Sequence, residues 1–361
     1  MVGSENAGIG PYTLGLVNAK GEVVATVTAN TPSDYHSVGG DPGITSTSDS
    51  RLYYEDGNTN IDYLTATGQH GVAFTISRPT GAEVAFAVSP DDTRVAVAVL
   101  TNWEDATGNG GEPPYSSHMY LMAMGGGIQQ TLFDGTGSSS TAPLTWPVGW
   151  DGDNLVVAQT LPGDFTGYYP GTGPCAMGTD CSSQLRVFNP ATRTLGPPLC
   201  AEEAGVITIG SPTAAGIACM PIGTAGDPAK KLESVSWSGV ITSFGTNIPG
   251  SCLLSPHGAV IACPSDLVED ATGQHTIRAQ AFRASGVVQR IPNPLDFQLI
   301  GWIDGNDVVV TTGGSIALGG EFGGLAVENI VTGKRIPVSL ATSPNPYSVR
   351  WQFLGAIPGA L

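Results

Sequence analysis

Basic residues are scarce in this sequence, and no apolar run is long. Of its 361 residues, 14 are lysine or arginine and 31 are aspartate or glutamate, giving a formal net charge of −17. Nucleic acids and anionic membrane surfaces both require a basic face, so the charge balance argues against them as partners. No apolar run approaches the roughly 18 residues of a membrane-spanning helix. The sequence therefore predicts no transmembrane segment.

Several signatures of catalysis and metal binding are also missing. There is no Gly-x-Ser-x-Gly, no Cys-x-x-Cys and no glycine-rich loop between a strand and a helix. These absences argue against an α/β-hydrolase nucleophile, a cysteine zinc site and a phosphate-binding loop. The histidines of predicted loops, His36, His118 and His275, come from distant parts of the chain, and we interpret them as solvated. We expect no catalytic residue of these types, no metal site and no cofactor.

The sequence does contain a repeated strand–turn–strand pattern. Its clearest copy spans 87–99, AVSPDDTRVAVAV, where Ser89 can bond the backbone ahead of it and Pro90 presets φ for a turn. The short, β-branched apolar run that follows is typical of a strand covered on both faces. Six such inner hairpins are predicted, at 45–55, 87–99, 148–159, 209–220, 253–264 and 300–311.

A second series of hairpins lies between the copies of the first. Most of these outer hairpins have glycine at the tip, which supplies the positive φ of a tight turn. They are predicted at 14–27, 62–76, 119–133, 184–199, 233–244, 277–291 and 325–339. An inner and an outer hairpin together make a four-stranded antiparallel sheet. A chain that repeats such a sheet along its length indicates a β-propeller.

The first and last copies of the pattern are incomplete. The outer hairpin at 14–27 has no inner partner, and the inner strand that begins the segment 353–361 has no outer partner. We therefore expect an all-β, seven-bladed β-propeller whose ring is closed by strands from both termini. No second inner strand is evident after Gly359, so we expect only three strands in the shared blade.

The predicted propeller occupies residues 12–361 as one domain. Residues 1–11 lack the basic and apolar regions of a signal peptide, and we expect them to be a disordered, artificial or processed start. A larger parent protein with an export signal or a membrane anchor upstream fits this expectation.

The Ser-Pro-Asp turns resemble the WD40-like repeat of TolB-type β-propellers. Ser89-Pro90-Asp91 carries the resemblance best, followed by Ser255-Pro256 and Ser211-Pro212. The resemblance implies the propeller fold. Because the superfamily includes scaffolds, sensors and enzyme-attached modules, it implies no single activity.

Six cysteines, an even number, predict an oxidised protein that is extracellular or in the cell envelope. Cys252 and Cys263 lie symmetrically about a predicted turn, at the cross-strand separation that a disulfide accepts. Of the fifteen pairings that six cysteines allow, we favour Cys175–Cys181, Cys200–Cys219 and Cys252–Cys263. The alternative is six reduced thiols in the core.

The long predicted connections between inner and outer hairpins share one face of the propeller, and long loops on a rigid frame commonly bind ligands. Their aromatic and acidic residues are the predicted binding site: Trp103, Glu104, Asp105, Tyr115, Asp164, Phe165, Tyr168, Tyr169, Asp266 and Asp270. We expect a monomeric, non-catalytic binding, sensor or interaction module for a protein, peptide or glycan. The alternative is a hydrolase or lyase with carboxylates at the mouth of the central channel.

Overall fold

All the regular elements that the computed structural model describes are β-strands. The described residues are 2–4, 11–32, 45–80, 82–101, 115–127, 130–137, 144–160, 184–200, 206–221, 231–246, 252–269, 275–286, 288–291, 299–311, 325–338 and 351–353. Their strands form seven four-stranded antiparallel sheets, which we name A to G. Within these residues no helix is long and apolar enough to cross a membrane.

Four of the sheets come from the N-terminal half of the chain, and sheet A also includes the C-terminal strand. From inner to outer strand, sheet A contains β28 (Trp351–Phe353), β1 (Val2–Ser4), β2 (Tyr12–Val17) and β3 (Val23–Ala29). Sheet B contains β4 (Thr45–Thr47), β5 (Arg51–Asp56), β6 (Asn60–Thr65) and β7 (His70–Thr75). Sheet C contains β8 (Ala82–Val88), β9 (Arg94–Thr101), β10 (Tyr115–Ala123) and β11 (Gln130–Gly137). Sheet D contains β12 (Leu144–Asp151), β13 (Asn154–Thr160), β14 (Gln184–Asn189) and β15 (Thr194–Pro198).

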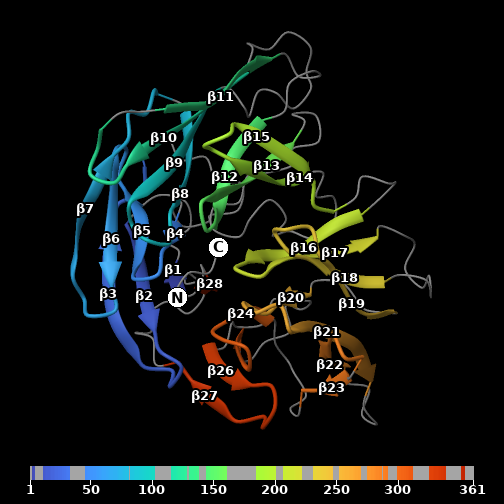
Figure 1. Cartoon of the computed structure of the whole chain (residues 1–361). Helices are drawn as coiled ribbons and strands as arrows, with labels where there is room; N and C mark the ends of the chain where they lie inside the picture. The colour runs from blue at the N-terminus through green and yellow to red at the C-terminus, as the bar shows by residue number, and fades with distance from the viewer. Residues whose placement is uncertain are drawn as a thin grey trace.

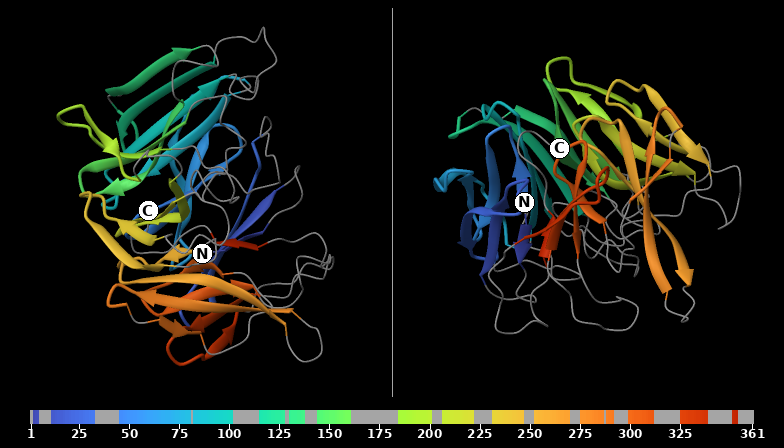
Figure 2. Two further views of the ribbon diagram at one scale, coloured as in Figure 1. Left: turned by 90° about the vertical axis from the view of Figure 1, so that its right-hand side faces the viewer. Right: turned by 90° about the horizontal axis from the view of Figure 1, so that it is seen from below.

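The remaining three sheets follow in chain order. Sheet E contains β16 (Val206–Thr213), β17 (Gly216–Pro221), β18 (Lys231–Val235) and β19 (Ile241–Thr246). Sheet F contains β20 (Leu253–Leu254), β21 (Val260–Glu269), β22 (His275–Arg283) and β23 (Val288–Arg290). Sheet G contains β24 (Leu299–Trp302), β25 (Asp307–Thr311), β26 (Leu325–Asn329) and β27 (Arg335–Pro337). The sheets stand side by side around a common centre, with the first strand of each toward the middle (Figures 1 and 2).

This arrangement is an all-β propeller of small antiparallel blades, as the sequence predicts. The six full inner hairpins and the seven outer hairpins are all confirmed as antiparallel strand pairs. Sheet A differs from the expectation in two ways. Its second strand is β1, from a segment that we expected to be disordered, and β1 pairs with both β28 and β2. The three-stranded blade is therefore wrong, because Val2–Ser4 supplies the strand that the C-terminal segment was expected to lack.

Buried serines begin three of the inner turns. The side chains of Ser48, Ser89 and Ser255 have no exposed surface. Each hydroxyl oxygen accepts a backbone N–H from further along its turn; Ser89 Oγ, for example, accepts from Arg94 N at 2.9 Å. A buried hydroxyl that satisfies otherwise unpaired N–H groups fixes the turn, which explains the Ser-Pro pattern.

Neighbouring sheets pack through apolar clusters. Sheet A packs on B, B on C, C on D and E, E on F, and F on G. A sixth cluster contains Val17 of sheet A with Val309, Leu325 and Val327 of sheet G. Two tryptophans add hydrogen bonds between sheets: Trp150 Nε1 donates to Ala87 O and Trp302 Nε1 to Leu253 O, each at 3.0 Å.

Two disulfides stabilise the second half of the chain, and both were predicted. Cys252 and Cys263, which share sheet F, have Cα atoms 4.2 Å apart. Cys200 follows β15 of sheet D and bonds to Cys219 in β17 of sheet E, with 6.0 Å between Cα atoms. Cys175 and Cys181 lie outside the described residues. Disulfides persist in oxidising compartments, so these bonds favour an extracellular or envelope location.

Candidate functional site

The two ends of the sheets differ in what they carry. The turn end holds the tight turns within the inner and outer hairpins, such as 48–50 and 66–69 in sheet B. The connection end holds the links between hairpins and between sheets, including the one after β3. The predicted ligand face is the connection end. The described residues form a polar cluster at each end of the sheets. The two clusters differ in whether their carboxylate oxygens have hydrogen-bond partners.

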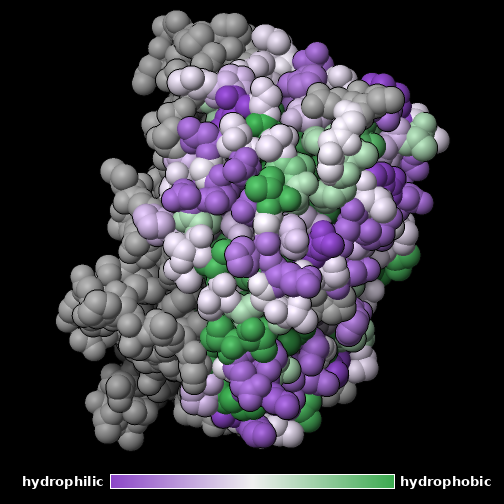
Figure 3. All heavy atoms as spheres, turned by 90° about the vertical axis from the view of Figure 1, so that its left-hand side faces the viewer, coloured by the Kyte–Doolittle hydropathy of each residue, from purple (hydrophilic) through white to green (hydrophobic). Residues whose placement is uncertain are grey.

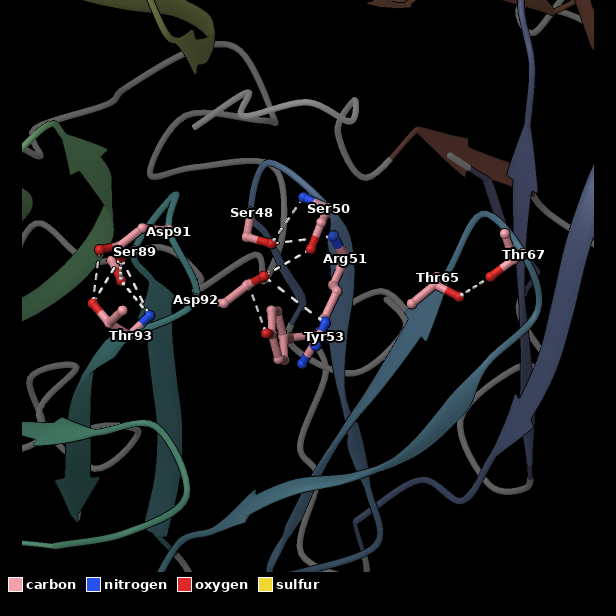
Figure 4. A network of polar contacts seen from close by, with 10 residues as sticks. All are labelled: Ser48, Ser50, Arg51, Tyr53, Thr65, Thr67, Ser89, Asp91, Asp92 and Thr93. Carbon is pink, nitrogen blue, oxygen red and sulfur yellow. Dashed lines mark hydrogen bonds and ion pairs between the residues drawn. The ribbon is translucent and has the colours of Figure 1, made fainter.

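At the turn end, the inner turns of sheets B and C meet in a closed polar network (Figure 4). Asp92 accepts hydrogen bonds from Ser50 Oγ and Tyr53 Oη, both at 2.7 Å, and Arg51 Nε lies 3.8 Å from its carboxylate. Asp92 has a φ of 60°, a left-handed backbone conformation that aspartate tolerates in turns. Because its oxygens are engaged by these donors, we assign Asp92 a structural role between two sheets.

Asp91 in the same turn is held in its ionised form. Hydrogen bonds from Ser89 Oγ (2.7 Å) and Thr93 Oγ1 (2.8 Å) lower the pKa of its carboxyl. A carboxylate stabilised in this way is a poor proton donor. The turn-end network therefore connects sheets and offers no general acid.

At the connection end, sheets A and B bring five polar side chains together. We call Tyr12, Asn30, Tyr54, Asp56 and Asp62 the carboxyl cluster. Tyr54 on β5 is directly opposite Asp62 on β6, and Asp56 is opposite Asn60. Since alternate residues of a strand point to the same face, Tyr54, Asp56 and Asp62 share the face toward sheet A. Tyr12 comes from the start of β2 and Asn30 directly follows β3.

Asp62 is the unusual member of the carboxyl cluster. Its residue surface is 9 % exposed, and its buried Oδ1 has no hydrogen-bond partner among the described residues. Burial, and then the negative charge of Asp56, raises the pKa of the Asp62 carboxyl, while His70 acts in the opposite direction. The adjacent β6–β7 pairing shifts register between Ile61 and Asp62, an irregularity of the kind often found beside functional sites. The fold thus gives the Asp62 carboxyl a higher proton affinity than that of a free aspartate.

Asp56 has the opposite environment. The backbone N and the side-chain Nδ2 of Asn30 both donate to Asp56 Oδ1 at 2.7 Å. These two N–H donors fix Asp56 Oδ1 as a hydrogen-bond acceptor. The cluster therefore pairs a buried carboxyl with a raised pKa with one that accepts hydrogen bonds from sheet A.

The tyrosines of the cluster stay protonated. Tyr12 is buried, and its hydroxyl donates a short hydrogen bond to the backbone oxygen of Glu55. Burial, followed by nearby acidic groups, raises the pKa of Tyr12 and Tyr54. Both side chains therefore contribute neutral phenol rings beside Asp56 and Asp62.

A buried ion pair supports the cluster from the other face of β5. Glu55 and Arg78 have side chains 3 % and 4 % exposed, and Arg78 Nη1 lies 3.5 Å from both carboxylate oxygens. Arg78 Nε also donates to Ala82 O at 2.5 Å, at the start of sheet C. Removing one partner of such a pair leaves a buried charge. Through Arg78, the contact connects β5 to the start of sheet C.

The predicted binding residues lie mostly outside the described residues. This applies to Trp103, Glu104, Asp105, Asp164, Phe165, Tyr168, Tyr169 and Asp270. Tyr115 is the first residue of β10, opposite Gly137, and Asp266 lies at a register shift in β21. The predicted site is untested by the structure and stays a prediction.

Asp56 and Asp62 were not among the predicted site residues. Asp56 begins an Asp-Gly-Asn sequence, which is typical of a turn, and the structure has that turn at 57–59. The available signal for Asp62 was an acidic residue inside the apolar stretch IDYL. An aspartate at a position that faces a neighbouring sheet is costly and calls for an explanation.

Comparison with known proteins shows similarity at the level of fold. No family model and no curated protein matches the sequence. Among solved structures, an oligogalacturonate lyase from Vibrio parahaemolyticus is 11% identical with a TM-score of 0.46, covering 74% of this chain and 72% of that one. TolB from Acinetobacter baumannii is 14% identical with a TM-score of 0.39, covering 81% and 62%. The β-propeller domain of the Trilobed protease from Pyrococcus furiosus is 11% identical with a TM-score of 0.47, covering 83% and 85%. In fold, the chain is similar to TolB β-propellers.

These similarities correct the functional prediction. We expected a non-catalytic binding module, but the similar structures include oligogalacturonate lyases, which are enzymes, as well as TolB propellers. The expectation of a non-catalytic module is therefore wrong. At this level of identity the similarity assigns no activity to this chain.

Proposed function

We propose that this chain is an acid–base hydrolase of glycosidic bonds, with its site at the carboxyl cluster of sheets A and B. The observation that carries the proposal is Asp62, a buried carboxyl with a raised pKa and an oxygen that lacks a hydrogen-bond partner within the described part of the chain. A general acid must hold its proton near the working pH, and burial is a common way to achieve this. A carboxyl kept in such a position without a hydrogen-bond partner costs stability, which a catalytic role would explain.

Asp56 is the second carboxylate of the proposed mechanism. It is the diagonal cross-strand neighbour of Asp62 on the same face, since Asp56 is opposite Asn60. Diagonal cross-strand neighbours have Cα atoms about 7–8 Å apart. The proposal requires the two carboxyl groups themselves to be roughly 6.5–9.5 Å apart, as in inverting glycosidases. In this mechanism Asp62 protonates the oxygen of the leaving group. Asp56, held by Asn30, takes a proton from the attacking water on the opposite side of the sugar ring.

The charge of the chain restricts the substrate. With a net charge of −17, the protein repels polyanions. Neutral saccharides suit the cluster better, because carboxylate oxygens accept hydrogen bonds from sugar hydroxyls. We therefore propose a neutral oligosaccharide as the substrate.

The proposed enzyme is a monomeric seven-bladed propeller over residues 12–361, completed by β1 and exported from the cell. The proposal of a closed ring is supported by the apolar clusters, which link each sheet to the next and sheet G to sheet A. Pairing of β28 with β1 supports closure by both termini. The two disulfides support export.

The test is hydrolysis of a panel of neutral oligosaccharides and aryl glycosides, followed by release of reducing ends and by NMR of the product anomer. Asp62→Asn and Asp56→Asn should each lower the rate at least a hundredfold, in line with the loss of acid or base catalysis. Asp49→Asn, on the exposed inner turn of the same sheet, is the matched control and should retain full activity. The mechanism predicts an inverted product; equal activity of all three variants would refute the proposed site.

A further inference from the structure

The two disulfides of the described residues differ in burial and in what they connect. Cys252 and Cys263 have no exposed surface and lie in the apolar cluster between sheets E and F. Cys219 is 5 % exposed, and Cys200 is partly exposed at the edge of another apolar cluster. Thiol–disulfide exchange needs an attacking thiolate to reach a sulfur atom, so reductants reach these bonds unequally.

Backbone pairing makes the bond within sheet F redundant. Leu253 pairs with Ala262, which places Cys252 and Cys263 directly opposite each other at the next position. The hairpin holds these residues together whether or not the bond exists. The bond therefore adds little restraint beyond that of the hairpin, and its two thiols would remain opposite each other after reduction.

The bond between Cys200 and Cys219 connects two separate sheets. Cys200 follows the outer strand of sheet D, where Leu199 N donates to Leu185 O at 2.9 Å. Cys219 is in the second strand of sheet E, opposite Thr208 and Glu233. No backbone pairing joins β15 to β17, because they belong to different sheets. The disulfide therefore restrains the junction between sheets D and E. Among the described strands, no backbone pairing crosses this junction, and side-chain packing is the other contact there.

We propose that Cys200–Cys219 is a redox-sensitive link between sheets D and E, and that Cys252–Cys263 is a permanent structural bond. A thiolate of a dithiol reductant attacks one sulfur of Cys200–Cys219 and forms a mixed disulfide. The other cysteine leaves as a thiolate and takes a proton. The second thiol of the reductant then displaces the first cysteine, so two electrons and two protons pass to the protein and the reductant becomes a disulfide. Opening this bond loosens the D–E junction while sheet F stays intact.

The experiment reduces the native full-length chain with graded dithiothreitol, alkylates free thiols and maps them by peptide mass spectrometry. Cys200 and Cys219 should be labelled together at reductant concentrations that leave Cys252 and Cys263 unlabelled. Labelling of Cys252 and Cys263 first, or of all four at once, would overturn the proposal.

Paired variants separate a linking role from simple accessibility. The double variant Cys200→Ser with Cys219→Ser should lower Tm by about 5 °C or more, and its Tm should no longer respond to mild reductant. The matched double variant Cys252→Ser with Cys263→Ser should keep the response to mild reductant. Hydrogen exchange at β15 and β17 should rise on mild reduction, and unchanged exchange there would contradict a link between the sheets.

Discussion

At the scale of single residues, the main finding is a carboxyl whose environment disfavours its charge. Asp62 lies on β6 opposite Tyr54, is largely buried, and has one oxygen without a hydrogen-bond partner in the described part of the structure. The sequence could not reveal this, because the burial of Asp62 depends on packing between two sheets and on Tyr12, which lies 50 residues earlier. The two carboxylate oxygens of Asp92, in contrast, accept hydrogen bonds from Ser50 and Tyr53.

The raised pKa of Asp62 gives a sign for the pH dependence of stability. The folded state binds this proton more tightly than the unfolded state. The contribution of Asp62 to the free energy of unfolding is therefore highest below the unfolded pKa of about 3.9. It falls as the pH rises through the raised folded pKa. Asp62→Asn removes that fall, so we expect its free energy of unfolding to exceed the wild-type value by about 1–3 kcal/mol at neutral pH. Urea unfolding between pH 3 and 8 measures the difference.

Asp49→Asn serves as the control for this titration, since Asp49 is exposed and resides at the turn end of sheet B. Its stability should follow the wild-type curve. A constant difference between Asp62→Asn and wild type at every pH would contradict the proposed burial effect.

Gly216 tests how tightly the inner hairpin of sheet E packs. Its φ is 131°, and a Cβ atom there would lie 2.1 Å from Val235 O. We expect Gly216→Ala to destabilise the protein by about 3 kcal/mol or more, because both backbone strain and a backbone clash must be relieved. Gly57→Ala is the control, since Gly57 also has a positive φ but no atom near the added Cβ. Equal chemical-denaturation midpoints for the two variants would show that the predicted clash is relieved at no cost.

At the scale of elements, the inner turns are what the sequence predicted best. The Ser-Pro pattern is local, since the hydroxyl of Ser89 or Ser255 bonds N–H groups only four or five residues ahead. Local patterns of this kind can be recognised without knowing the fold. β1 could not be recognised, because Val2–Ser4 has no alternation and becomes a strand only through pairing with β28 and β2.

The buried serine hydroxyls should contribute measurably to stability. We expect Ser89→Ala and Ser255→Ala each to lower the free energy of unfolding by about 1–2 kcal/mol, because they leave buried N–H groups without an acceptor. Ser243→Ala, at an exposed position in β19, is the control and should change stability by less than about 0.5 kcal/mol. Equal effects at buried and exposed serines would contradict the assigned role.

At the scale of the whole molecule, polar and apolar surfaces are distributed around the sheets. The outer face over β3, β6 and β7 is mostly polar with apolar side chains interspersed (Figure 3). Val24 of β3 and Val72 of β7 are 42% and 57% exposed. Isolated exposed apolar residues are normal on outer strands and imply no docking surface.

Contact between sheets A and G is the whole-molecule feature that a single substitution tests best. Gly21 lies in the turn between β2 and β3, and a Cβ there would lie 2.7 Å from Pro337 O of sheet G. Gly68 occupies the corresponding turn of sheet B with a similar φ, +83° against +76°, and no atom near an added Cβ. Gly21→Ala should therefore destabilise the protein by about 1–2 kcal/mol more than Gly68→Ala, as thermal unfolding would show. Equal Tm values would contradict close packing between the first and last sheets.

The central claim is that Asp62 acts as the acid of a glycoside hydrolase at the carboxyl cluster. Its most direct test is the rate of hydrolysis of neutral oligosaccharides by wild type and Asp62→Asn, measured on protein whose folding is confirmed by urea unfolding. The account predicts that wild type hydrolyses at least one member of the panel and that Asp62→Asn, although at least as stable, loses a hundredfold or more of that rate. Equal rates, or the absence of hydrolysis by wild type across the panel, would contradict it.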